Sequence, residues 1–83
     1  MTKKQKLIAR LLSKPKDFTY DEARALLISF GFTEHNKGRT SGSRVEFYRD
    51  NDTILMHKPH PSGILKPYQV RQLADFLQEL KLI

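Results

Sequence analysis

The chain has 83 residues, of which 39% are hydrophobic and 29% are charged, and its formal net charge is +6. This length and composition predict one small soluble globular domain rather than a disordered chain. The absence of cysteine excludes a disulfide framework and a thiolate metal site. No run approaches the roughly 18 consecutive apolar residues of a membrane span, and no signal-peptide pattern opens the chain. We therefore expect a cytoplasmic protein that makes no membrane contact.

The positive charge lies in two blocks. Residues 1–16 carry six basic side chains and no acidic one, and residues 37–49 carry four basic side chains against Glu46. Between them, residues 17–36 carry four acidic side chains against Arg24. Two basic blocks on either side of an acidic segment suggest a surface for a polyanion, and a solvated surface with a basic tail is the alternative interpretation.

Two helices are predicted at the start of the chain. Residues 3–13 have apolar side chains at the i, i+1, i+4, i+5 spacing of a helix with one buried face, and Pro15 follows its end. Thr19 begins a second helix, because Glu22 follows three residues later in the spacing of a capping box. Gly31 ends this helix as a residue suited to the left-handed conformation.

The middle of the chain predicts three strands. Residues 32–37 form a weakly marked first strand. In residues 44–49 polar and apolar side chains alternate, which gives this strand one buried and one exposed face. Residues 50–52, Asp-Asn-Asp, form a hairpin turn, and residues 53–57 return as the third strand.

Pro67 begins a final helix, whose apolar stripe runs from Val70 to Leu80. The order of elements is therefore α-α-β-β-β-α. It predicts an α+β fold in which helices pack on one face of a small three-stranded antiparallel sheet and leave the other face open.

A hairpin holds its two outer ends side by side. The basic, glycine-containing residues 38–44 should therefore lie next to residues 57–67, which follow the third strand. Two of the three histidines of the chain stand in these segments. We expect any chemistry or polyanion binding there.

His60, and after it His57, are candidates for metal-independent RNA cleavage. Such cleavage needs a base that takes the 2′-hydroxyl proton and an acid that protonates the leaving 5′-oxygen, and histidine suits both roles near neutral pH. A purely structural role in a proline-rich turn is the alternative. No third ligand stands nearby, so we expect neither a metal nor another cofactor.

Cations around the two segments are candidates for phosphate contacts, and a flexible connector with incidental charge is the alternative. Tyr48, on the open sheet face, could stack a base or simply form the rim of the hairpin. The predicted RNA-binding residues are Lys37, Arg39, Ser43, Arg44, Tyr48, Lys58, Lys66 and Arg71.

Four short motifs follow one another in a characteristic order. They are the helix end Leu26-Leu27-Ile28-Ser29-Phe30-Gly31-Phe32, the pair Gly42-Ser43 before a strand, the turn Pro59-His60-Pro61 and the helix start Leu65-Lys66-Pro67-Tyr68-Gln69-Val70. With them, the chain from Phe18 to Leu82 resembles the HicA family of bacterial toxin–antitoxin proteins. The resemblance implies a fold like the double-stranded-RNA-binding domain, cleavage of mRNA, and a HicB-like antitoxin that covers the basic face. It also implies a single domain over residues 1–83, with residues 1–16 as an additional basic helix.

One departure from the family bears on activity. The family places its catalytic histidine directly after Gly-Ser, where this chain has Arg44. Arginine stays protonated near neutral pH and does not act as an ordinary general base. Three alternatives follow: His57 or His60 performs the chemistry, the domain only binds RNA, or it acts through its partner. A protein-interaction domain whose basic face meets an acidic partner is the alternative from another class.

Overall fold

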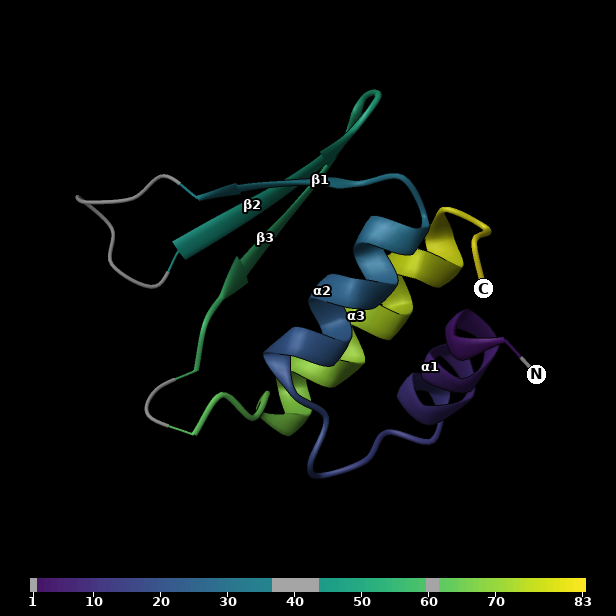
Figure 1. The fold of residues 1–83 in the computed structure, drawn as a ribbon, viewed down its shortest axis with the longest axis vertical. Coiled ribbons are helices and arrows are strands. Elements are labelled where there is room, and N and C mark those ends of the chain that lie inside the picture. Colours follow the sequence, from purple (N-terminus) through teal and green to yellow (C-terminus); the bar gives the residue numbers. More distant parts are fainter. Residues whose placement is uncertain (1, 37–43, 60–61) are drawn as a thin grey trace.

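The structure is a computed structural model that describes residues 2–36, 44–59 and 62–83. Its described residues follow the order α-α-β-β-β-α, which confirms the predicted α+β fold. Figure 1 shows the helices gathered on one side of the sheet. The elements are α1 (Lys3–Leu12), α2 (Tyr20–Ser29), β1 (Thr33–Asn36), β2 (Arg44–Arg49), β3 (Asp52–His57) and α3 (Pro67–Glu79).

Local sequence signals set the bounds of α2. The Thr19 hydroxyl accepts a hydrogen bond from the Glu22 N–H at 3.1 Å, and the Glu22 carboxylate accepts one from the Thr19 N–H at 3.0 Å. This reciprocal pair is the predicted capping box. At the other end Gly31 has φ +98°, and the Phe32 N–H donates to the Leu27 carbonyl at 3.1 Å. Both predicted helix ends are confirmed.

The sheet has the strand order β1-β2-β3, and both pairings are antiparallel. Along β2, Val45 and Phe47 are buried, as the alternation predicted. The hairpin turn is one residue shorter than expected, because Asp52 already pairs with Arg49 and begins β3. Asp50 carries the positive φ, +51°, that a tight turn requires.

The hydrophobic core fills the space between the sheet and the helices. Among the described residues, no polar or charged residue is buried. The largest fully buried side chains come from all layers of the fold and are Phe18, Phe47, Leu11, Leu26, Leu27, Leu65, Leu77, Val45 and Val70. None of the helices in the described part of the chain has the length and apolarity that a membrane span requires.

The segment that leads into α3 is held against the start of α2. The Tyr20 N–H donates to the Gly63 carbonyl, and the Leu65 N–H donates to the Phe18 carbonyl, both at 2.8 Å. Thr19 and Ile64 form an isolated antiparallel bridge at the same place. These backbone bonds fix residues 63–65, which belong to the candidate segment 57–67, against the start of α2.

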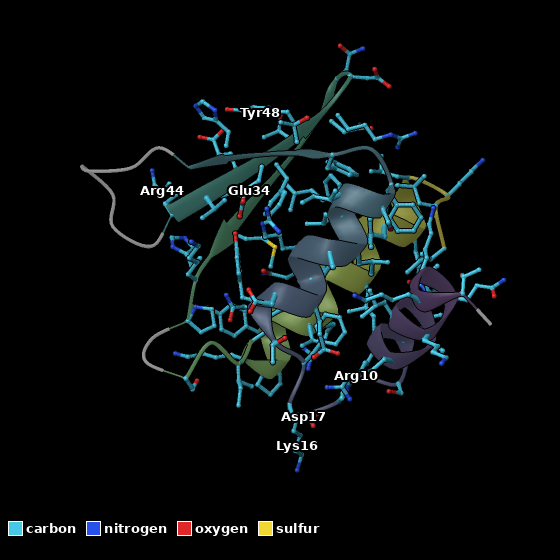
Figure 2. All side chains as sticks on the ribbon, in the orientation of Figure 1. Arg10, Lys16, Asp17, Glu34, Arg44 and Tyr48 are labelled. Atoms are coloured by element: carbon cyan, nitrogen blue, oxygen red, sulfur yellow. The ribbon has the colours of Figure 1, made fainter. Side chains whose placement is uncertain are left out.

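Arg10 joins α1 to the start of α2. Its guanidinium donates to both carboxylate oxygens of Glu22, at 2.5 and 3.1 Å, and to the Asp17 carboxylate at 3.0 Å (Figure 2). The same group lies 5.7 Å from the centre of the Phe18 ring. Leu11, on the same helix, is fully buried. The first helix is therefore packed on the domain by apolar contact and by a forked ion pair.

Replacing Arg10 with alanine should lower the melting temperature of the protein, because it removes the forked contact to Glu22 and frees part of α1 from α2. The measurement is thermal unfolding followed by circular dichroism. Lys6→Ala is the matched control, since Lys6 is an exposed cation of the same helix. Equal melting temperatures for the two variants would contradict the structural role of Arg10.

Candidate functional site

The open end of the hairpin, where β2 begins and β3 ends, brings two of the candidate residues together. Arg44 and His57 are partners in the antiparallel register, and both are exposed. Lys58 follows His57 directly. Figure 2 shows the Arg44 side chain at this end of the sheet. A permanently charged guanidinium group and an imidazole group therefore lie opposite each other on neighbouring strands.

Four predicted site residues lie outside the described part of the chain. They are Lys37, Arg39, Ser43 and His60. Their assigned roles stay predictions from the sequence. The described residues nearest to them in the chain are Asn36 and Arg44 on one side, and Pro59 and Ser62 on the other.

Gln69 ties the start of α3 to the end of β3. Its side-chain N–H donates to the His57 carbonyl at 3.1 Å, and its side-chain oxygen accepts from the Lys66 N–H at 2.9 Å. Lys66 is the N-cap residue of α3, and Pro67 is its first helical residue, as predicted. This amide therefore holds Lys66 close to His57. Gln69 was missed as a site residue, although a glutamine three residues after the N-cap is a recognisable capping signal.

Lys58 borders a polar cavity of about 420 Å³ beside the start of α2. Its ammonium lies 5.3 Å from the centre of the Tyr20 ring. The Tyr20 hydroxyl donates to Glu34 at 2.6 Å, and Arg24 donates to the same carboxylate at 2.8 Å. The contact of Lys58 with the Tyr20 ring is one that its predicted role in phosphate binding did not include.

The carboxylate of Glu34 accepts the hydrogen bonds of both Tyr20 and Arg24 in this cavity. Burial alone would raise its pKa, but the hydrogen bonds from Arg24 and Tyr20 outweigh burial, and the net effect lowers the pKa. Burial, and then the bond to Glu34, raises the pKa of the Tyr20 hydroxyl. Glu34 is therefore ionised and Tyr20 is neutral at physiological pH. The ammonium of Lys58 thus lies near a carboxylate whose negative charge does not change around neutral pH.

Acid should destabilise the protein through Glu22 and Glu34. The hydrogen bond from Arg10 lowers the pKa of Glu22, and the bonds described above lower that of Glu34, in both cases from 4.5. A lowered folded-state pKa means that the unfolded chain binds protons first as the pH falls. The stabilisation is thus complete above about pH 5 and is lost progressively at lower pH.

Urea unfolding at a series of pH values measures this effect. The free energy of unfolding should fall as the pH is lowered from about 5 toward 2, and Glu34→Gln should show a shallower fall than the wild-type protein. Parallel curves for the two proteins would show that Glu34 does not contribute to the loss of stability in acid.

Tyr48 lies on the open face of the sheet, apart from Arg44 and His57 at the open end of the hairpin. Its side chain is 37% exposed, its hydroxyl donates to Glu46 at 2.6 Å, and the His35 ring packs edge-on at 5.7 Å. Tyr48 is four residues further along β2 than Arg44, about 13 Å at the usual rise of a strand. Tyr48 therefore does not belong to the group of residues around Arg44.

The structure thus brings four of the predicted residues to one end of the domain. Arg44, His57, Lys58 and Lys66 surround the open end of the hairpin and the start of α3. Arg71 is exposed one turn further along α3. Within the described ranges, no group of three histidine or carboxylate side chains is arranged to hold a metal ion.

Comparison with known families identifies the chain. Neither a curated protein nor a solved structure gives a significant match. The family model described as the HicA toxin of bacterial toxin–antitoxin matches residues 20–82, which is most of the chain and includes α2, β1, β2, β3 and α3. Helix α1 lies before the matched region. The chain therefore belongs to the HicA toxin family, and it is a toxin of the toxin–antitoxin type.

Proposed function

We propose that this HicA toxin binds RNA at the open end of the hairpin and cleaves it without a metal ion, as an mRNA interferase in the cytoplasm. The observation that carries the proposal is the placement of Arg44 opposite His57 in the register of β2 and β3. Lys58 follows His57 directly, and Lys66 is joined to His57 through the Gln69 side chain, so both add positive charge near this pair. A concentrated positive charge beside an imidazole suits a phosphodiester substrate.

The reaction that fits these groups is an internal transfer at phosphorus. A histidine base removes the proton from the 2′-oxygen, which attacks the adjacent phosphorus and forms a new P–O bond. The bond from phosphorus to the 5′-oxygen breaks, and a histidine acid protonates that oxygen. The products are a 2′,3′-cyclic phosphate and a 5′-hydroxyl end. His57 and His60 are the proposed acid–base pair, and Arg44 stabilises the charge on the phosphorane.

Arg44 also defines the second candidate function. It occupies the position of the family's catalytic histidine and does not serve as a general base. A domain that has kept RNA binding and given up cleavage would use Arg44 only as a phosphate contact. A protein-interaction domain without RNA affinity is the third candidate, and the exposed basic groups at the hairpin end would then meet an acidic protein.

Family membership gives the toxin an antitoxin partner, and we propose a HicB-like protein in that role. Binding over the hairpin end would cover Arg44 and His57 together and block RNA. We further propose that residues 1–83 form one domain, in which α1 is an addition to the matched region. The contacts of Arg10 with Glu22 support this, because they join α1 to the first turn of α2.

The dependence of RNA affinity on salt tests the binding claim. For a single-stranded RNA, the logarithm of the affinity should fall linearly with the logarithm of the salt concentration, with a slope of about −0.7 for each phosphate contacted. Arg44→Ala should make this slope shallower by about 0.7, the contribution of one phosphate contact, and should weaken binding to all RNA sequences alike. Lys81→Ala is the control, since Lys81 follows the end of α3 close to the C-terminus, and Figure 1 shows the C-terminus on the side away from the open end of the hairpin.

Two results would contradict the binding claim. An Arg44→Ala protein that binds like the Lys81→Ala protein would remove the hairpin end from the RNA surface. An absence of RNA binding at low salt would leave the protein-interaction domain as the function.

A further inference from the structure

A groove of about 220 Å³ lies between the edge strand β3 and helix α3. It begins at His57, so it is continuous with the open end of the hairpin. Its volume is below the roughly 300–1,000 Å³ of sites for drug-sized ligands and suits a single planar ring system. Residues of both elements line it, among them Leu55 and His57 of β3 and Tyr68, Gln69, Gln72 and Phe76 of α3.

The groove combines an apolar surface with a few polar groups. Tyr68 is 51% exposed and lines the groove from the first turn of α3. Gln72 is exposed on the same face of α3, and within the described ranges its amide has no hydrogen-bond partner. Proteins commonly stack an unpaired nucleobase on an aromatic ring and form hydrogen bonds to its edge with a nearby polar side chain such as an amide.

The backbone of β3 adds a donor and an acceptor to the groove. The His57 carbonyl points toward α3, because it accepts from the Gln69 side chain. Main-chain groups two residues apart on a strand point to the same side, so the N–H and C=O of Leu55 also point away from β2 and toward the groove. This pair of groups matches the adjacent acceptor and donor on the edge of a nucleobase.

We propose that this groove is a subsite for one unpaired nucleobase of the RNA, stacked on Tyr68 and bonded at its edge by Gln72 and the Leu55 backbone. The proposal rests on the proposed function, because it places the nucleotide next to the phosphate held at Arg44 and His57. Charge supports the same occupant: Lys66 is joined to His57 through Gln69, and it offers a cation for that nucleotide's phosphate.

The alternative occupant, a protein strand added to the edge of the sheet, fits less well. The Gln69 side chain already occupies the His57 carbonyl. A strand that ran along β3 toward the hairpin end would therefore lose a ladder bond at that residue. A single base needs only the free groups of Leu55 and the ring of Tyr68, both of which are available.

Binding of 2′-O-methylated RNA tests the subsite, because such RNA lacks the 2′-hydroxyl needed for cleavage. The probes are single-stranded homopolymers of the four bases and an abasic ribose-phosphate chain of the same length. Tyr68→Ala should lower the affinity for the preferred homopolymer by about tenfold, the typical effect of losing one stacked base. Tyr68→Phe should keep that affinity, and the abasic chain should bind the wild-type and Tyr68→Ala proteins equally.

The polar part of the proposal has its own variants. Gln72→Ala should reduce the preference among the four homopolymers, whereas Gln78→Ala, an exposed glutamine of the last turn of α3, should leave it unchanged. Both positions are exposed, so folding is expected to be intact and is checked by circular dichroism.

The possible failures are distinguishable. If Tyr68→Ala and the wild-type protein bind every RNA alike, while Arg44→Ala weakens binding, the subsite is wrong and the proposed function stands. If Tyr68→Ala weakens only the complex with a co-expressed cognate antitoxin, the groove receives a protein segment, which also overturns the subsite. If the wild-type protein binds no RNA, the proposed function itself fails and the subsite fails with it.

Discussion

Replacing both His57 and His60 with alanine abolishes RNA cleavage by the purified toxin and relieves growth arrest when the toxin is expressed. A positioned general acid or base contributes about 10²- to 10⁴-fold, so the loss of both leaves no measurable cleavage. His57 is exposed at the end of β3, and its replacement removes no core contact. The double variant should therefore fold like the wild-type protein and still bind RNA through Arg44 and Lys66.

His35→Ala is the matched control for this experiment. His35 is the third histidine of the chain, is exposed on the open sheet face, and lies on β1 opposite Glu46. Its loss should leave cleavage unchanged. If the double variant cleaves RNA at the wild-type rate, neither histidine takes part in the reaction. If His57→Ala alone is fully active and His60→Ala is inactive, the second member of the acid–base pair is a different residue.

Phe47→Ala unfolds a large fraction of the protein at physiological temperature. Phe47 is fully buried in the centre of β2, between the sheet and the helices, and its ring lies 6.4 Å from that of Tyr20. Removing a buried phenylalanine costs about 3–5 kcal/mol. That is a large share of the roughly 5–15 kcal/mol that stabilises a typical domain, and a chain of 83 residues has a small core.

Urea unfolding measures this loss, and Tyr48→Ala is the control on the same strand. Tyr48 points to the open face, so its replacement should leave the urea midpoint close to that of the wild-type protein. It should weaken RNA binding instead, since an aromatic ring on the open face is lost. Equal destabilisation by the two substitutions would show that the Tyr48 face of the sheet is not exposed to solvent.

The fold was predictable because its signals are local. The Thr19–Glu22 capping box, Gly31 after the last turn of α2 and Pro67 at the start of α3 each act within a few residues, and all are found where the sequence placed them. The alternation along β2 likewise identified which face is buried. The turn length was missed by one residue, because three consecutive polar residues do not reveal which of them pairs.

The contacts that position the candidate site were not predictable, since they join residues distant in the sequence. Arg10 contacts Glu22 across twelve residues, and the Gln69 side chain reaches the His57 carbonyl across the same separation. Glu22 and Gln69 carry local capping signals, but nothing local indicated that they also contact Arg10 and the His57 carbonyl. For Lys58, charge predicted a phosphate contact, but its position over the Tyr20 ring depends on how β3 meets α2. Local patterns do not specify such packing.

The juxtaposition at the hairpin end, in contrast, followed from topology alone. A two-strand hairpin with a short turn must place its outer ends together, and Arg44 is indeed the register partner of His57. The catalytic and binding roles of the residues around this end stay predictions. They depend on chemistry that a family match and a register do not test.

Metal-free cleavage is the most direct test of the central claim. The toxin is purified without its antitoxin and incubated with a mixed-sequence RNA in EDTA over a range of pH, and the ends of the products are analysed. We predict cleavage with an optimum near the pKa of histidine, which leaves 2′,3′-cyclic phosphate and 5′-hydroxyl ends. RNA that is bound but remains intact under these conditions would contradict the claim. The protein would then be a domain that binds RNA without cleaving it, in which Arg44 serves only as a phosphate contact.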